Sequence, residues 1–254
     1  MSMIYLLPPL EMVFFNSITM HRCSHKKYAN SITVAVLSLF TAVFLGIGYY
    51  LRFPLTGDSK YGLTGLLYLI PLKFLYREKL SRLFVSMCMS WVYTLGVASV
   101  AVQITGLLDS SRSIGFQIIV ETILFLITMV PFYREVVPKY IFVLQNIELF
   151  GENEYKYLAL NSCLAFLVLA CVQTQFSLEE TSLLHLAILC LLLGSIAVSY
   201  LIIYRIIMDS KKIQQLEYEA FHDALTGLGN RAQLWNDLQE FCGAESVFSV
   251  IRCV

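Results

Sequence analysis

The sequence predicts an all-α polytopic membrane bundle of about seven transmembrane helices, followed by an incomplete α/β fragment. Of its 254 residues, 57% are hydrophobic and only 14% are charged, whereas soluble globular chains carry roughly a quarter charged residues. The apolar residues form runs close to the length of about 20 helical residues that crosses a hydrocarbon layer. After residue 207 the sequence becomes charged and polar, and this change predicts the start of a cytoplasmic segment.

Seven apolar segments have the composition of membrane-spanning helices. They cover residues 3–20, 31–51, 61–76, 83–107, 114–132, 157–175 and 182–207. The first and third are the weakest, because the first contains Pro8, Pro9 and Glu11 and the third is short, with Pro71 near its end. Neighbouring helices can cover the carbonyl group that a proline frees in a spanning helix. Both segments therefore stay in the prediction.

The distribution of Lys and Arg residues predicts the topology. Four alternate connections hold twelve of them: Arg22, Lys26, Lys27, Arg77, Lys79, Arg82, Arg134, Lys139, Lys156, Arg205, Lys211 and Lys212. The opposite connections hold only Arg52, Lys60 and Arg112. Basic residues accumulate in short cytoplasmic loops. The pattern predicts an outside N-terminus, seven crossings of the inner or plasma membrane, and a cytoplasmic C-terminus.

Charge and cysteine content exclude several classes of protein. The formal net charge is zero, so we expect no nucleic-acid partner, because contact with phosphates needs a basic surface. The seven cysteines form no CxxC pair, and most lie in apolar runs, where a thiol behaves as a small hydrophobic group. Neither a disulfide scaffold nor a metal site is expected.

Residues 208–221, MDSKKIQQLEYEAF, predict a helical signalling linker. This segment is charged and lacks Gly and Pro. Four apolar residues follow one another at spacings of seven, three and four: Ile206, Ile213, Leu216 and Ala220. Such a narrow apolar seam pairs helices, so it predicts a homodimer through the linker. An ordinary amphipathic exit helix is the alternative.

The next residues predict a turn and a capped helix. Residues 226–229, Thr-Gly-Leu-Gly, cannot continue a helix, and Asp223 is a good turn residue because its short side chain accepts hydrogen bonds. Asn230 is a suitable N-cap, and Gln233 stands where its amide can reach back in a capping box. Residues 231–241 have helical apolar spacing and Gly243 ends them, while residues 247–251, VFSVI, predict a buried strand.

The stretch HDALTGLGNRAQL resembles the opening motif of the GGDEF family, the diguanylate cyclase domain, which commonly reads D-x-L-T-G-L-x-N-R-x-x-L. Eight residues match it: Asp223, Leu225, Thr226, Gly227, Leu228, Asn230, Arg231 and Leu234. The resemblance covers residues 218–251 and implies a bacterial signalling protein. It divides the chain into a seven-helix sensor or input region (1–207), the linker (208–221) and a truncated N-terminal part of a GGDEF-like domain (222–254).

The same resemblance implies a chemistry that this chain lacks. In the family, two domains hold two GTP molecules face to face, and Mg²⁺ bound by carboxylates assists formation of cyclic di-GMP. The first metal-binding Asp normally follows the strand that residues 247–251 resemble. Here Arg252, Cys253 and Val254 follow, with no acidic residue and no GG[DE]EF turn. We expect no catalytic residue, GTP or Mg²⁺ in this chain, and an inactive cyclase.

Glu11 and Glu121 are the ionisable residues placed most clearly inside the predicted spans. Such residues are costly in hydrocarbon and often mark an ion or ligand pathway that faces the interior of the bundle. We therefore predict a candidate intramembrane polar site at this pair. The alternative is that Glu11 lies near the outer surface and that Glu121 accepts hydrogen bonds from a hydroxyl such as that of Thr122 or Ser90.

Three functions are consistent with these features. The first is the membrane signal-input region of a diguanylate-cyclase-type protein of the cyclic di-GMP pathway, embedded in the lipid bilayer and sensing an unidentified ligand. The second is a small multi-pass transporter or channel, for which Glu11, Glu121 and Gln103 are the candidate polar residues within the spans. The third is a non-functional gene fragment.

Overall fold

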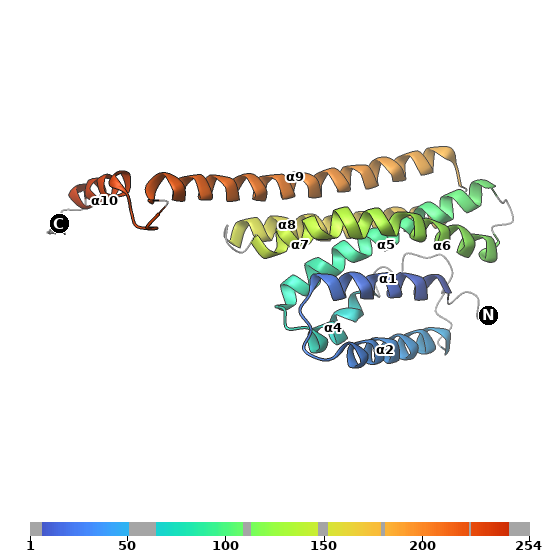
Figure 1. Ribbon diagram of the computed structural model, residues 1–254. Coiled ribbons are helices and arrows are strands. Elements are labelled where there is room, and N and C mark those ends of the chain that lie inside the picture. Colours follow the sequence, from blue (N-terminus) through green and yellow to red (C-terminus); the bar gives the residue numbers. More distant parts are fainter. Residues whose placement is uncertain are drawn as a thin grey trace. The chain divides into compact units, whose positions relative to one another are not determined.

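The computed structural model of the chain describes residues 7–50, 65–108, 113–146, 152–178, 181–223 and 225–243. These residues form helices, with two isolated β-bridges and no strand among them. The chain divides into two compact units, Met1–Tyr204 and Arg205–Val254. In chain order the helices (Figure 1) are α1 (Leu7–Cys23), α2 (Asn30–Tyr50), the 3₁₀-helix η2 (Gly65–Tyr68), α4 (Leu69–Leu75), α5 (Leu80–Leu108), α6 (Ile114–Pro131), the π-helix η3 (Phe132–Val136), α7 (Val137–Asn146), α8 (Glu152–Leu178), α9 (Leu183–Phe221) and α10 (Arg231–Gly243).

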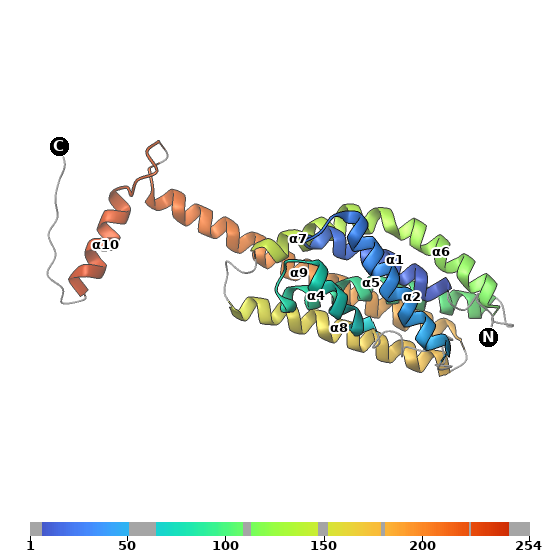
Figure 2. The same cartoon turned by 90° about the horizontal axis from the view of Figure 1, so that it is seen from below.

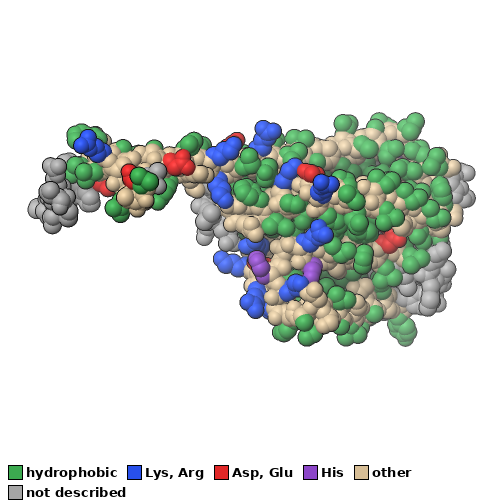
Figure 3. Space-filling view, viewed as in Figure 1, with side chains coloured by type: hydrophobic (Ala, Val, Ile, Leu, Met, Phe, Trp, Pro, Cys, Tyr) green, Lys and Arg blue, Asp and Glu red, His purple; other side chains and the backbone are tan. Residues whose placement is uncertain are grey.

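Five helices are long and apolar enough to cross a membrane, which indicates a membrane protein. They are Asn30–Ile47, Leu80–Leu108, Ile114–Asn146, Tyr155–Gln173 and Leu183–Phe221. Large apolar side chains such as Ile127 and Leu191 are exposed on these helices, and apolar side chains cover much of the face of the first unit in Figure 3. Side chains of this kind are stable when they face lipid tails.

The prediction of seven spans is wrong, because two of the segments form shorter helices in the described residues. Helix α1 has 17 residues, and its second and third residues are Pro8 and Pro9, which fit the first turn of a helix, where the backbone N–H groups have no helical partner. Residues Gly65–Leu75 form one short apolar helix. Tyr76 then adopts an extended conformation, with φ −115° and ψ 153°, and ends α4.

The fifth predicted span is longer than expected. We predicted its end at residue 132, but one continuous helical segment runs from Ile114 to Asn146. Pro131 is the last residue of α6, and the π-helix η3 follows it directly. The Phe132 N–H group donates to the carbonyl oxygens of Met129 and Thr128. The helix therefore does not stop at the proline, and a wider π-turn follows it directly.

Helix α5 is the centre of the first unit, and α1, α4, α6 and α8 pack around it (Figures 1 and 2). Most of its residues are buried. Small residues allow this close packing, as they do in other membrane bundles. A Cβ atom built on Gly96 would lie 2.9 Å from Cδ2 of Leu193, which shows how closely α9 approaches at this point.

Contacts along α1 and α6 show that these helices run parallel. The ring of Phe15 stacks on the ring of Phe125, with centroids 4.4 Å apart, and one turn further along, the Thr19 hydroxyl lies 2.9 Å from the Tyr133 hydroxyl. Helix α5 runs in the opposite direction, because it begins where α1 ends. The two helices that carry Glu11 and Glu121 therefore start at the same end of the unit.

The second unit contains the last part of α9, a turn and α10. The prediction of an α/β fragment is wrong for the residues described here, which form a helix, a turn and a helix without a strand. Hydrogen bonds within a turn and a helix are local, whereas a strand needs a neighbouring strand. The predicted helix at 231–241 is confirmed within α10, and the residues that would show whether Gly243 ends it lie outside the described part of the chain. The predicted strand at 247–251 lies outside the described residues.

Candidate functional site

Two basic loops meet at one end of the first unit. One joins α1 to α2 and the other joins α4 to α5. The Lys27 N–H group donates to the Leu75 carbonyl oxygen over 2.9 Å, and the Arg77 N–H group donates to the His25 carbonyl oxygen over 3.0 Å. These bonds belong to the bridge between Lys26 and Tyr76. In Figure 3 the Lys and Arg side chains of the first unit gather toward one end.

The Glu78 carboxylate contacts two basic side chains at this end of the unit. Its carboxylate lies 2.7 Å from His25 Nδ1 and 3.5 Å from Arg82 Nε. Burial raises the pKa of Glu78, but the hydrogen bonds from the side chain and backbone of His25 and the charge of Arg82 outweigh burial, so that the pKa is lowered. The segment after α6, which is also basic, begins close to these two loops. Tyr133 lies at its start, and the Arg22 guanidinium lies 4.7 Å above the centre of the Tyr133 ring. The sequence did not single out this Glu78 cluster.

The structure brings the predicted intramembrane residues Glu11 and Glu121 together. Thr122, the neighbour of Glu121 on α6, donates a 2.7 Å hydrogen bond from its hydroxyl to Glu11 Oε1 on α1. Glu121 is 1% exposed, and it directly precedes the residue that donates to Glu11. Neither Glu121 oxygen has a hydrogen-bond partner among the described residues, and the same is true of Glu11 Oε2.

The alternative explanation for Glu121 does not hold, because both hydroxyls that we considered as its donors bond elsewhere. The single hydroxyl hydrogen of Thr122 has Glu11 Oε1 and the Ile118 carbonyl oxygen as its acceptors, at 2.7 and 2.8 Å. Ser90 donates to Asn16 Oδ1 on α1, and Thr94 donates to the same oxygen. Gln103, the third polar residue considered for a pathway, is buried, and its Oε1 atom has no partner in the described part of the chain. The Asn16 cluster was not predicted, although an Asn within an apolar run is a sequence signal for such a contact.

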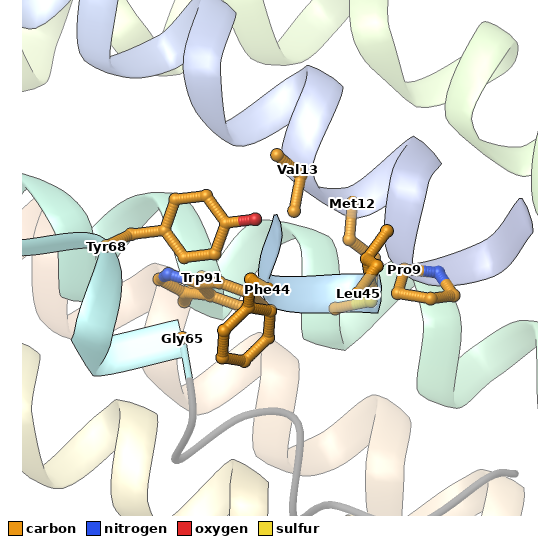
Figure 4. A pocket seen from close by; sticks show the side chains of 8 residues that line it. All are labelled: Pro9, Met12, Val13, Phe44, Leu45, Gly65, Tyr68 and Trp91. Atoms are coloured by element: carbon orange, nitrogen blue, oxygen red, sulfur yellow. The ribbon is translucent and has the colours of Figure 1, made fainter. Parts of the chain in front are cut away.

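Two hollows in the first unit are small and apolar. One lies between α1, α2, η2 and α5, and Figure 4 shows its lining: Pro9, Met12, Val13, Phe44, Leu45, Gly65, Tyr68 and Trp91. Its volume is about 20 Å³, enough for roughly one water molecule and far below the roughly 300 Å³ of the smallest ordinary ligand pockets. Gly65 is required beside it, because a Cβ atom there would lie 2.4 Å from Cζ2 of Trp91.

The second candidate site is the turn between α9 and α10, where the residues matching the GGDEF motif lie. Asp223 accepts three hydrogen bonds of 3.0 to 3.1 Å, from the N–H groups of Leu225 and Thr226 and from the Thr226 hydroxyl. Backbone bonds from Thr226 and Leu225 and the side-chain bond from Thr226 lower the pKa of Asp223. Gly227 has φ +67° and donates its N–H to the Asp223 carbonyl oxygen.

Asn230 is the N-cap of α10, as predicted. Its Oδ1 accepts hydrogen bonds from the N–H groups of Ala232 and Gln233, at 2.8 and 3.2 Å. The predicted capping box does not form, because the Asn230 N–H group donates to the Phe221 carbonyl oxygen and Gln233 Oε1 has no partner among the described residues. The other matched residues play smaller parts: Leu228 accepts from the Asp223 N–H group, Arg231 begins α10, and Leu234 is exposed.

Neither site assembles a metal centre from described residues, since no three His, Cys, Asp or Glu side chains group together in this part of the chain. No family model, curated protein or solved structure matches the chain. The resemblance to the GGDEF family therefore rests on the motif residues between Asp223 and Leu234, and it stays a prediction.

Proposed function

We propose that the chain is the membrane signal-input region of a diguanylate-cyclase-type protein of the cyclic di-GMP pathway. In this proposal the first unit responds to a signal in the membrane, and α9 carries the response to the turn that holds the motif residues. The basic end formed by the two loops faces the cytoplasm of a bacterial cell, as the accumulation of Lys and Arg residues favours.

The observation that carries this proposal is the hydrogen-bonded turn between α9 and α10. Each polar residue of the motif up to Asn230 has a defined role there: Asp223 and Thr226 close the turn, and Asn230 caps α10. The side chain of Asn230 also donates to the Ala220 carbonyl oxygen at the end of α9, over 2.7 Å. One side chain thus joins both helices, so a displacement of α9 is passed to α10 instead of being lost in a flexible linker.

A second copy of the chain is the partner that the linker favours. Ile206, Ile213 and Leu216 are exposed on α9 at the spacing of a helix-pairing seam. Two chains that pair through this seam would bring two downstream segments side by side. This arrangement suits a family whose reaction needs two domains face to face.

A small transporter or channel is the alternative, and the buried pair Glu11 and Glu121 is the observation that favours it. A pathway for solutes also needs room and polar lining. Two hollows that the structure shows in the first unit have volumes of about 20 Å³ each and almost entirely apolar walls. Signal input fits this packing better, because it requires a shift of helices and no open path.

The test is a fusion of residues 1–243 to the remainder of a complete GGDEF domain, produced in bacteria that lack other cyclases. We expect cyclic di-GMP to form, and Asn230→Ala to change its cellular level at unchanged protein amount. Asn236→Ala, at an exposed position of α10, is the matched control and should have no effect. Equal product from a fusion that lacks residues 1–204, or from the Asn230→Ala fusion, would contradict the proposed coupling.

A reporter tests the orientation separately. An enzyme that is active only in the cytoplasm, fused after residue 243, should be active. Activity of a reporter that works only outside the cytoplasm at the same position would reverse the topology, whatever the result with cyclic di-GMP.

A further inference from the structure

The contact between α1 and α6 contains two carboxyl groups and too few donors for them. Of their four oxygen atoms, only Glu11 Oε1 has a hydrogen-bond partner among the described residues, the Thr122 hydroxyl. Glu121 is almost fully buried, whereas Glu11 is half-buried. One turn further along, the stacked rings of Phe15 and Phe125 close the contact with apolar surface.

Among the residues that the structure describes, the charged and titratable groups near this contact do not neutralise two carboxylates. The helices that pack against α1 or α6 are α2, α5, η3 and α7. The groups on these helices, on α1 and on α6 are Glu11, His21, Arg22, Cys23, Tyr50, Arg82, Cys88, Tyr93, Glu121, Tyr133, Arg134, Glu135, Lys139 and Tyr140. The basic members lie at the other end of the helices. Arg22 is eleven residues from Glu11 along α1, about 16 Å away, and Arg82 pairs with Glu78.

Two ionised carboxylates cannot share such a place. An unpaired charge in a medium of low dielectric constant costs several kcal/mol or more, and a second negative charge beside it adds repulsion. A bound metal ion would need water molecules to complete its shell of about six to eight oxygen ligands, because one hydroxyl and two carboxylates do not supply them all. A single proton needs only the two carboxyl groups.

We propose that Glu11 and Glu121 together bind one proton. The proton forms an O–H bond with one carboxyl group, which donates a hydrogen bond to the other, and the pair keeps one negative charge. On deprotonation the O–H bond breaks, water takes up the proton, and two negative charges remain at the contact between α1 and α6. Half-buried Glu11 is the entrance for the proton, and buried Glu121 is its inner partner.

The position of the pair gives this proton access to one side of the bundle. Glu11 lies in the second turn of α1, and Glu121 lies seven residues from the start of α6, about 10 Å along the helix. Both helices start at the end opposite the basic loops. Loss of the proton would push α1 and α6 apart at this end. The pair would bind its proton whether or not the second unit leads into a catalytic domain.

Infrared spectroscopy of the full chain in lipid nanodiscs tests this proposal, because a protonated carboxyl group absorbs at a frequency distinct from that of a carboxylate and shifts in D₂O. In sodium-free buffer at pH 7 we expect one such band, which Glu121→Gln removes and Glu217→Gln, at an exposed position of the linker, retains. Raising the pH should remove the band from the unsubstituted protein. Replacing choline by sodium at constant pH should leave it unchanged.

Absence of the band at pH 7 in the unsubstituted protein would overturn the proposal. So would a band that sodium abolishes, which would indicate a cation site. The unsubstituted protein alone can give either result, so the test remains decisive if Glu121→Gln fails to fold. In Glu11→Gln the neighbouring negative charge is gone, and we expect the band to disappear at a pH lower by about one unit or more. An unshifted midpoint would show that Glu121 binds its proton alone, against the proposed sharing.

Discussion

The side chain of Asn230 joins the end of α9 to the start of α10 by donating to the carbonyl oxygen of Ala220 over 2.7 Å. Its Oδ1 atom accepts from the N–H groups of Ala232 and Gln233 at the same time. The amide therefore satisfies a carbonyl group that α9 leaves free at its end and two N–H groups that α10 leaves free at its start. A carboxylate in the same place could not donate to Ala220.

Asn230→Ala should remove both contacts and destabilise α10 by about 1 kcal/mol. The amide protons of α10 should then exchange with solvent several times faster, which hydrogen exchange measured by mass spectrometry on the full chain would show. Asn230→Asp separates the two roles, because it keeps the cap but loses the donor to Ala220. We expect its effect to fall between those of Ala and the control Asn236→Ala.

Gly227→Ala should destabilise the turn by about 1 kcal/mol. The reason is the backbone, since Gly227 has φ +67° and a Cβ atom there would meet nothing within 4 Å. Gly227→Asn should cost less, because Asn adopts left-handed conformations more readily. Exchange rates of the Asp223 and Gly227 amide protons would rank the three proteins. Equal rates for Ala and Asn would argue against backbone strain as the cause.

The turn should loosen in acid through Asp223. The folded turn lowers the pKa of this carboxyl group below its ordinary value of 3.8. A lowered pKa means that the stabilisation is fully present above the ordinary value and is lost as the pH falls through the lowered one. The amide NMR signals of Leu225 and Thr226 should therefore shift together below pH 3.8. In Asp223→Asn the turn keeps an acceptor without a titrating group, and the shift should disappear.

Gly65→Ala should disrupt the packing of η2 on α5. The new methyl group would lie 2.4 to 2.9 Å from three atoms of the Trp91 ring, and overpacking of this kind costs about 1 to 3 kcal/mol. A lower melting temperature of the purified protein and altered Trp91 fluorescence, measured in a Trp235→Phe background, would show it. Gly46→Ala and Gly194→Ala are the controls, because nothing lies within 4 Å of a Cβ atom at either position.

Local patterns in the sequence predict much of this fold. Long apolar runs identify the five helices that can cross a membrane, and the pairing of Asn with a preceding Thr-Gly-Leu-Gly turn identifies the cap of α10. The continuation of the helix through Pro131 was missed, because proline normally ends a helix and the π-turn that follows it leaves no clear mark in the sequence. The α/β fragment was wrong in the described residues for a related reason. A family resemblance at one turn does not supply the neighbouring strands that a sheet requires.

For the candidate site as well, the local sequence identifies individual residues but not the partners that packing gives them. Glu11 and Glu121 stand out because each is an ionisable residue in an apolar run, and the structure brings them together. The packing of α1, α5 and α6 decides which acceptor each hydroxyl donates to. The residues that determine this packing lie up to about a hundred positions apart in the sequence. Ser90 could therefore be recognised as a donor and Asn16 as a polar residue in an apolar run, but the bond between them could not be predicted.

The bond between the Arg77 N–H group and the His25 carbonyl oxygen also places the end of α1 and the start of α5 on one side of the first unit. The polypeptide leaves this point along α2 and comes back to it at the end of α4, so the excursion between residues 25 and 77 starts and finishes on one side. The number of complete crossings within it must be even, even though Gly65–Leu75 is too short to count as one by length. A tally of long helices alone would assign α5 the opposite direction, whereas the backbone bonds between the two loops place the starts of α2 and α5 on the same side.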